Sequence, residues 1–361
     1  FEPETLAFFL TSVGFSVAGS SAPDGMGRHC LLFLAALALF FALGVWLRDL
    51  HRVRAMRWPM AFAALGFLAL NLLLSETIWG AKNWLSIAGQ TLQPSEFVKI
   101  AYVYAGAATL DRLFRRRNLI LFIAFSAVCV GALALMGDFG TALVFFVCFL
   151  VISFMRSGSF ATLFLAIGGA ALAVMLVLTV KPYVAQRFAT WGHAWEDPLN
   201  TGFQQVRTMS ATAAGGLFGR GAGAGWLKNI FAANTDMVFG VVCEELGLIV
   251  ALCCVLSLLL LAVFSVRSAA AGRSSYYVIA SCATVTIFMA QLALNVFGSL
   301  DLLPFTGVTF PFVSKGGSSL ISCWGMLAYI KAGDTRSGGS FALRTSFENA
   351  RRGKKEKEAV K

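Results

Sequence analysis

The chain alternates long apolar runs with short polar segments. Several runs approach the roughly 20 residues that a helix needs to cross a bilayer, so each predicts a transmembrane helix. Ten spans are expected, at 5–20, 30–47, 58–75, 97–110, 119–136, 139–155, 160–180, 237–265, 275–297 and 310–332. The pattern therefore predicts an all-α polytopic membrane protein with about ten transmembrane helices.

Composition supports this class. Hydrophobic residues make up 58% of the 361 residues, charged residues only 13%, and the mean hydropathy is +0.76. A soluble domain of this size could not cover so much apolar surface with polar groups. The eight cysteines lie in or beside apolar runs and form no CxxC pair, and the three histidines are scattered, so a His-based metal site is not expected.

Basic residues predict the orientation of the spans. They gather in 48–57, in 111–117, at Arg156, at Arg267 with Arg273, and after 334. Each group falls between an even and an odd span or after the tenth, so both ends of the chain are expected to be cytoplasmic. The net charge of +11 is then explained by orientation and by attraction to anionic membrane lipids rather than to nucleic acid. We expect a transmembrane domain over 1–333 and a disordered basic tail over 334–361.

One outer loop, roughly 181–236 between spans seven and eight, is much longer than the others. Its tryptophans and phenylalanines argue against disorder and predict a folded extracytoplasmic cap. Gly-rich backbone beside Arg207 and Arg220 could cradle phosphate, although glycine in membrane proteins more often serves close helix packing.

Three carboxylates in the stretch ANTDMVFGVVCEELG (233–247) are unexpected in such an apolar region. An acid inside the membrane is costly and is a functional candidate by default. On a helix, Asp236 and Glu244 would lie about 12 Å apart along the axis, too far for the closely spaced carboxyl pair of a retaining glycosidase. We expect Asp236 at the mouth of the eighth span, and Glu244 and Glu245 deeper, where they need partners.

Other charges in or beside the apolar runs suggest such partners. Glu96 and Lys99 stand at i and i+3 in LQPSEFVKI and can pair. Two interpretations remain open: a buried structural pair, or a Lys99 that also neutralises Glu244 or Glu245 and shapes a polar cavity. Asp138 in GDFGTAL is expected at an outer helix start, where an acid stabilises the helix dipole.

Six sequence blocks resemble one known family. They are AKNWLSI (81–87), LQPSEFVKI (92–100), GDFGTALV (137–144), DPLNTGFQQ with AAGGLFGRG (197–221), NTDMVFGVVCEELG (234–247) and LPFTGVTFPFVSKGGSSL (303–320). In this order they resemble the SEDS proteins of shape, elongation, division and sporulation, the RodA, FtsW and SpoVE family. The resemblance implies a peptidoglycan glycosyltransferase in the bacterial plasma membrane that polymerises lipid II and releases undecaprenyl pyrophosphate.

The resemblance also implies site roles and partners. The family's essential acid corresponds to Asp236, expected to act as general base on the acceptor's sugar hydroxyl in an inverting transfer. Arg187 and Arg207 are candidates to stabilise the departing pyrophosphate, and Gln204 to bind sugar or phosphate. The expected partners are lipid II, membrane lipids and a class B penicillin-binding transpeptidase. No cofactor is evident, and the involvement of a divalent cation is left open.

The chain departs from the family pattern at three places. Asn234 replaces a His or similar residue, Phe231 stands where a proline is expected, and Lys315 replaces an aromatic residue. Lys315 near the cavity is a candidate to bind phosphate or to pair with Glu244 or Glu245. Two alternative functions remain: a flippase for lipid-linked precursor, and a non-enzymatic scaffold for a penicillin-binding protein. In the case of the scaffold, Asp236→Asn would leave function intact.

Overall fold

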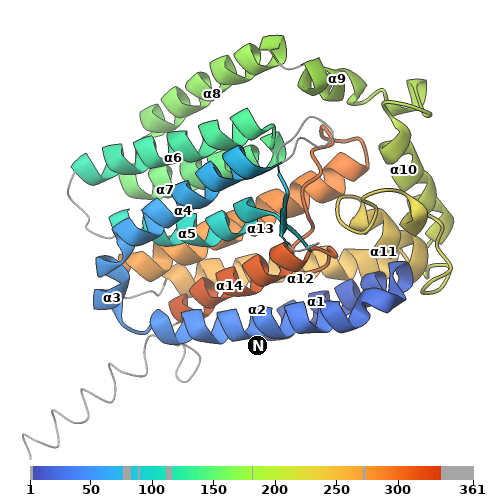
Figure 1. Cartoon of the computed structure of the whole chain (residues 1–361), viewed down its shortest axis with the longest axis horizontal. Helices are drawn as coiled ribbons and strands as arrows, with labels where there is room; N and C mark the ends of the chain where they lie inside the picture. Colours follow the sequence, from blue (N-terminus) through green and yellow to red (C-terminus); the bar gives the residue numbers. More distant parts are fainter. Residues whose placement is uncertain are drawn as a thin grey trace, which may run out of the picture.

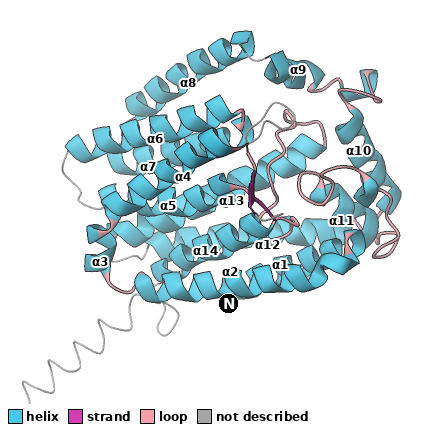
Figure 2. Cartoon of the chain, in the orientation of Figure 1, coloured by secondary structure: helices cyan, strands magenta, loops and turns pink. Residues whose placement is uncertain are grey.

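A computed structural model describes residues 3–75, 83–87, 90–110, 116–180, 182–270 and 274–334. Within these residues the chain is a bundle of helices, most of which run along the long axis of the molecule (Figures 1 and 2). Nearly all of the basic tail predicted over 334–361 lies outside the described residues, so its expected disorder stays a prediction.

Each of the ten expected spans overlaps a helix or a pair of helices, although the helix of the tenth, expected over 310–332, begins only at Gly317. The long helices are α1 (Pro3–Ser21), α2 (Met26–Trp46), α4 (Arg57–Leu74), α5 (Pro94–Leu110), α6 (Arg116–Met136), α7 (Phe139–Ser157), α8 (Phe160–Val180), α12 (Leu248–Ala270), α13 (Ser275–Ser299) and α14 (Gly317–Gly333). The all-α architecture is therefore confirmed. Among the described residues, five helices are long and apolar enough to cross a membrane by themselves, and the exact number of crossings stays a prediction.

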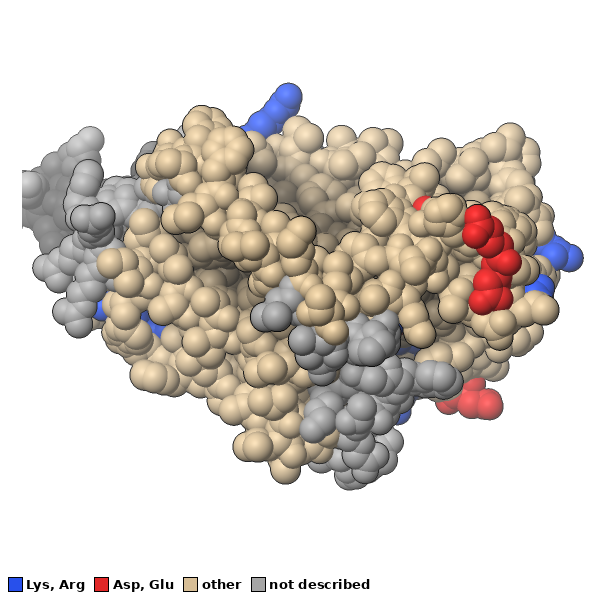
Figure 3. Space-filling model, turned by 90° about the horizontal axis from the view of Figure 1, so that it is seen from above, with Lys and Arg blue, Asp and Glu red and all other residues tan. Residues whose placement is uncertain are grey.

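The outer surface of the bundle is apolar, as a lipid-facing surface requires. Large side chains such as Leu73, Leu165 and Phe164 point out of the fold. Figure 3 shows that most of one face is uncharged, and that the acidic residues visible on it gather toward the end where α10 lies in Figure 1. Charge is thus concentrated away from the middle of this face.

Helix α14 forms the centre of the bundle, and most of its residues are buried. Its Trp324 indole makes edge contacts with the rings of Phe8, Phe33, Phe40 and Phe312, at centroid distances of 4.9–6.0 Å. The indole N–H also donates to the Thr11 hydroxyl at 3.2 Å. These contacts join α1 and α2 to α14 and to the loop before it.

The long loop between α8 and the eighth span is folded, as predicted. It contains α9 (Pro182–Thr190), the 3-10 helix η2 (Ala194–Glu196), α10 (Phe203–Gly215) and the 3-10 helix η3 (Leu227–Asn229). In Figure 1 these elements lie at one end of the bundle, and the short helix α3 (Leu50–Ala55) lies at the other. A small antiparallel hairpin of β1 (Leu85–Ile87) and β2 (Gln90–Leu92) lies nearer the middle of the molecule in Figure 2 than the end that carries α9 and α10. That this end is extracytoplasmic stays a prediction.

The eighth span differs from the single helix expected over 237–265. It is divided into α11 (Val238–Leu246) and α12 (Leu248–Ala270). The break falls at Gly247, whose φ of +91° is a conformation that L side chains rarely adopt. Its N–H still bonds to the Val242 and Cys243 carbonyls, both at 3.1 Å. A residue without a side chain is needed here because a Cβ would clash with the backbone of Leu217 and Phe218.

Candidate active site

Asp236 lies in a tight turn before α11 rather than on a helix. Its N–H donates to the Ala232 carbonyl at 2.9 Å, and the Thr235 hydroxyl donates to the same carbonyl at 3.1 Å. Ala232 itself adopts a φ of +61°. The helical geometry that we expected between Asp236 and Glu244 is therefore wrong, because the helix begins only at Val238.

A second loop, about 80 residues later in the chain, makes hydrogen bonds to this turn. We call residues 303–316, between α13 and α14, the clasp loop. Its Ser314 hydroxyl donates to the Thr235 carbonyl at 2.7 Å, and its Lys315 N–H donates to the Asn234 carbonyl at 2.8 Å. Two consecutive carbonyls directly before Asp236 are thus fixed by the clasp loop.

Asn295 of α13 joins the same two segments. Its amide nitrogen donates to the Asp236 carbonyl at 3.0 Å and to the Val308 carbonyl of the clasp loop at 2.8 Å. Asn295 is buried, and an unpaired carbonyl at this depth would be costly. Sequence reasoning missed this residue, although its amide, one of two with Gln291 in the apolar run 275–297, was a usable signal.

The Asp236 carboxyl group is half-buried and closely surrounded. A Cβ at Gly307 of the clasp loop would lie 2.9 Å from Oδ2 of Asp236, so only glycine leaves the carboxylate its place. Burial raises the pKa of Asp236 to about 6, the Asp138 charge adds to the rise, and a Thr235 side-chain hydrogen bond and the Arg187 charge oppose it. A carboxyl group with this pKa can accept a proton near neutral pH.

Arg187 is the loop cation that the structure brings to Asp236. It lies on α9, and its guanidinium donates to the Phe305 carbonyl of the clasp loop at 3.4 Å. Its charge also acts on the Asp236 carboxyl group. The side chain therefore connects the long loop to the clasp loop, and its charge lowers the pKa of the candidate base.

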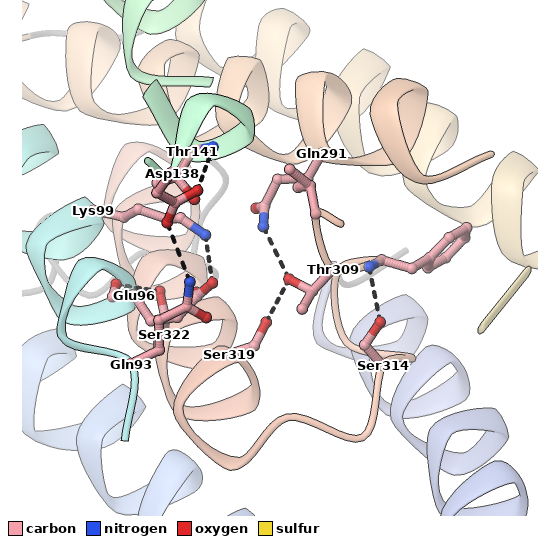
Figure 4. Close-up of polar contacts among 12 residues, drawn as sticks. Gln93, Glu96, Lys99, Asp138, Thr141, Gln291, Thr309, Ser314, Ser319 and Ser322 are labelled. Atoms are coloured by element: carbon pink, nitrogen blue, oxygen red, sulfur yellow. Dashed lines mark hydrogen bonds and ion pairs between the residues drawn. The ribbon is translucent and has the colours of Figure 1, made fainter. Parts of the chain in front are cut away.

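A polar network lies beside this site, at the starts of α5 and α7 (Figure 4). Lys99 and Glu96 form the expected ion pair at 2.7 Å, and both are buried. Asp138 caps α7 as predicted, because its carboxylate accepts from the Thr141 N–H at 3.1 Å and also from the Gln93 amide at 3.4 Å. The Asp138 charge also contributes to the raised pKa of Asp236.

Glu244 and Glu245 bind the Gly-rich part of the long loop. Glu244 accepts from the Trp226 and Leu227 N–H groups, both at 3.0 Å, and lies 3.8 Å from Arg220. Glu245 accepts from the Ser20 hydroxyl at 2.6 Å and from the Gly223 N–H at 3.1 Å. Both glutamates thus have the partners that they need at this depth, most of them in the long loop.

The structure decides between the two interpretations of Lys99, which was expected to pair with Glu96 alone or also with Glu244 or Glu245. The ion pair that the structure gives Lys99 is with Glu96, and the one it gives Glu244 is with Arg220. The interpretation in which Lys99 neutralises Glu244 or Glu245 is therefore wrong. Lys315 likewise forms no ion pair with either glutamate among the described residues.

The remaining loop candidates lie on α10. The Arg207 guanidinium is placed over the rings of Phe203 and Trp226, at 5.3 and 5.8 Å from their centroids. The Gln204 amide reaches the Phe231 carbonyl at 3.5 Å, five residues before Asp236 in the chain. Neither side chain contacts Asp236 in the described structure, so their substrate-binding roles stay predictions.

The described residues contain no group of three or more His, Cys, Asp or Glu side chains that could hold a metal ion. Fold and site together define a polytopic helical membrane protein with a half-buried carboxyl group at one end of the bundle. The family model described as cell cycle protein, for FtsW, RodA and SpoVE, matches residues 13–335. The chain belongs to this family.

Curated relatives share most of the chain. It is 32% identical to a probable peptidoglycan glycosyltransferase FtsW of Tolumonas auensis over 336 residues, covering 88% of this chain and 87% of the relative. It is 28% identical to the peptidoglycan glycosyltransferase RodA of Mycobacterium tuberculosis, covering 86% and 71%. It is 30% identical to the stage V sporulation protein E of Bacillus subtilis, covering 81% and 82%.

Solved structures show the same fold. A chain of a peptidoglycan synthase complex, studied for the coordination of polymerization and crosslinking, matches with a TM-score of 0.77 and 28% identity over 92% of this chain and 96% of that one. The rod shape determining protein RodA of Thermus thermophilus matches with a TM-score of 0.68 and 24% identity over 91% and 94%.

Proposed function

We propose that this protein is a peptidoglycan glycosyltransferase that polymerises lipid II, with Asp236 as its general base. The observation that carries the proposal is the Asp236 carboxyl group, half-buried, with a pKa raised to about 6 by burial and with the Arg187 charge acting on it. A base of this strength and a cation are what glycosyl transfer from a lipid diphosphate requires. Relatives that carry the name peptidoglycan glycosyltransferase support the assignment.

The reaction is a single displacement. The Asp236 carboxylate removes the proton from the acceptor's sugar hydroxyl as that oxygen attacks the anomeric carbon of the donor. The bond between this carbon and the lipid diphosphate breaks, and the diphosphate leaves with the bonding electrons. Attack from the face opposite the leaving group inverts the anomeric centre. Arg187 stabilises the charge that develops on the diphosphate.

One carboxylate is sufficient because a diphosphate leaves readily without protonation. Glu244 and Glu245 are committed to the backbone of the Gly-rich loop, so they shape the site without taking part in proton transfer. Gln204 and Arg207 of α10 bind the sugar or phosphate of the substrate where it extends along the long loop.

The cellular setting and the partner are part of this proposal. The protein works in the bacterial plasma membrane with the Asp236 end outside and both chain ends in the cytoplasm. Its partner is a class B penicillin-binding transpeptidase, which crosslinks the strands that it makes. The match to a chain of a complex that polymerises and crosslinks supports such a partner.

The test is polymerisation of labelled lipid II by the purified protein, with and without its transpeptidase partner. Wild type is expected to make glycan chains, and folded Asp236→Asn to make none. The exposed Asp24→Asn removes the same charge and is expected to behave as wild type. Adding EDTA to the same assay tests whether a divalent cation contributes.

Two results would contradict the proposal. Chains from both wild type and Asp236→Asn would remove Asp236 from the mechanism. No chains from wild type with the partner present would favour the alternatives, a flippase for lipid-linked precursor or a scaffold. Transport of lipid II in vesicles would then separate these two.

A further inference from the structure

Lys315 provides a positive charge beside the Asp236 turn that the mechanism above does not use. Its N–H is fixed on the Asn234 carbonyl at 2.8 Å, so its position follows that of the turn. Its side chain is partly buried. Among the residues that the structure describes, no carboxylate forms an ion pair with its ammonium group.

The first turn of α14 follows directly. The N-cap is Gly316, which supplies no side-chain hydrogen bond, so the first N–H groups of this 17-residue helix have no cap. Such N–H groups and the positive end of the helix dipole favour an anion. At Gly317 a Cβ would lie 2.7 Å from a methyl carbon of Leu32, which shows that α2 packs closely against this turn.

His29 lies on the face of α2 that meets the turn. It precedes Leu32 by three residues, so the two side chains project from the same face. His29 is only 6% exposed, and no described residue hydrogen-bonds to its ring nitrogens. Its ring contacts Phe15 edge-on at 4.7 Å, and the Lys315 charge acts on it. A mostly buried imidazole with no hydrogen-bond partner among the described residues thus lies on the face of α2 that packs against the start of α14, within reach of the Lys315 charge.

These three features share one chemistry. An ammonium group, a polar imidazole and uncapped helix N–H groups all favour a multivalent anion such as a phosphate or a diphosphate. No carboxylate of the described residues is seen to neutralise them. Lys315, His29 and the first turn of α14 therefore supply the donors of an anion site, and they lie next to the segment that carries the candidate base.

We propose that Lys315, His29 and the first turn of α14 bind the diphosphate of the lipid-linked acceptor. This inference rests on the proposed function, because a reaction that joins two lipid-linked units must hold two diphosphates. The donor diphosphate leaves from the carbon under attack, so it lies next to Asp236 and Arg187. The acceptor diphosphate lies at the other end of its disaccharide from the attacking hydroxyl.

The electrostatics of the site agree with this division. The charges that act on the Asp236 carboxyl group are those of Arg187 and Asp138, whereas the Lys315 charge acts on His29. Arg187 of α9 then binds the donor diphosphate, and Lys315 of the clasp loop binds the acceptor diphosphate.

The test measures binding of labelled lipid II to the full chain in nanodiscs, in the inactive Asp236→Asn background so that no turnover occurs. Lys315→Met is expected to weaken binding about tenfold, the size of one lost charged hydrogen bond. Lys315→Arg should retain the affinity, and His29→Leu should lower it. Arg28→Met removes an exposed cation one residue from His29 and should leave binding within about twofold of the background protein.

In the active enzyme, Lys315→Met should raise the KM for lipid II and leave kcat within about twofold, because the loss concerns binding. Thermal unfolding of each variant checks that it is folded. Unchanged lipid II affinity in folded Lys315→Met overturns the inference and leaves the proposed function intact if wild type makes glycan. Equal weakening of phosphatidylglycerol binding also overturns it, because the site would then be an ordinary lipid headgroup site. A wild type that neither binds nor polymerises lipid II overturns both.

Discussion

The Ser314 hydroxyl donates to the Thr235 carbonyl at 2.7 Å, across 79 residues of chain. The same hydroxyl accepts from the Phe310 N–H at 2.9 Å. One side chain thus connects the turn that carries Asp236 to the fold of the clasp loop. The candidate base is thus positioned by contacts with a remote segment as well as by its own local turn.

The raised pKa of Asp236 predicts the pH dependence of the reaction. The base must be ionised to accept a proton, so the rate should fall below about pH 6 by up to tenfold per pH unit and level off above it. Initial rates of lipid II polymerisation between pH 5 and pH 8 measure this. A flat profile across pH 6, with the protein folded throughout, would exclude Asp236 as the group that titrates.

The same shift predicts how Asp236 affects stability. Its folded pKa of about 6 is above the usual 3.8, so the group's favourable contribution is present below pH 4 and is lost as the pH rises through 6. Asp236→Asn removes a buried charge at pH 7.5 and should raise the thermal midpoint by roughly 1–3 °C there. At pH 4 the difference should vanish. A lower midpoint for Asp236→Asn at pH 7.5 would contradict the burial of the ionised carboxylate.

Gly307→Ala should damage the site more than the fold. The φ of Gly307 is +70°, and an added Cβ would meet Oδ2 of Asp236 at 2.9 Å. Gly192→Ala is the matched control, because Gly192 has a φ of +76° and open space around its Cβ position. Both variants should lose about 1–2 kcal/mol of stability from backbone strain. Only Gly307→Ala should lose at least about tenfold in polymerisation rate. Equal activity in the two variants would show that the Gly307 contact is unimportant.

Removing Lys99 should be worse than removing its whole ion pair. Lys99→Met leaves a buried Glu96 carboxylate unpaired and should cost about 3–5 kcal/mol. The double variant Lys99→Met with Glu96→Gln should recover much of this loss. The thermal unfolding midpoints of the two variants and of wild type measure this difference in stability. If the double variant is no more stable than Lys99→Met, the pair is not the source of the loss.

Glu244→Ala should loosen the Gly-rich loop. It leaves the Trp226 and Leu227 N–H groups without their acceptor and removes the ion pair with Arg220, so local stability should fall by about 1–3 kcal/mol. Limited proteolysis should then cut the loop around 220–230 several times faster. Glu196→Ala, which removes an exposed acid paired with exposed His193, should leave the cleavage rate unchanged. Equal rates in the two variants would show that Glu244 does not hold the loop.

Much of the fold was predictable because each element is encoded locally. Apolar runs of membrane length placed the helices, and Asp138 before FGTAL indicated the start of α7, which the structure confirms. The i, i+3 spacing of Glu96 and Lys99 likewise predicted their ion pair. These features depend on residues within one or two helical turns of each other.

The site itself was only partly predictable. The sequence singled out Asp236, and resemblance gave it a role, but no local pattern could show which segments surround it. The contacts of Asn295, Gly307 and Ser314 depend on two loops meeting across the bundle. The break at Gly247 was missed because hydropathy does not register a single residue with positive φ inside an apolar run.

The clasp loop also has a consequence for biosynthesis. Ribosomes make a chain from the N-terminus, so the Asp236 turn emerges well before residues 303–316 that hold it. A nascent chain that ends before α13 carries the candidate base without Asn295, Gly307 or Ser314 around it. Under the proposed mechanism, the enzyme becomes competent only after the clasp loop has been made, and copies truncated before residue 303 are expected to leave precursor unused.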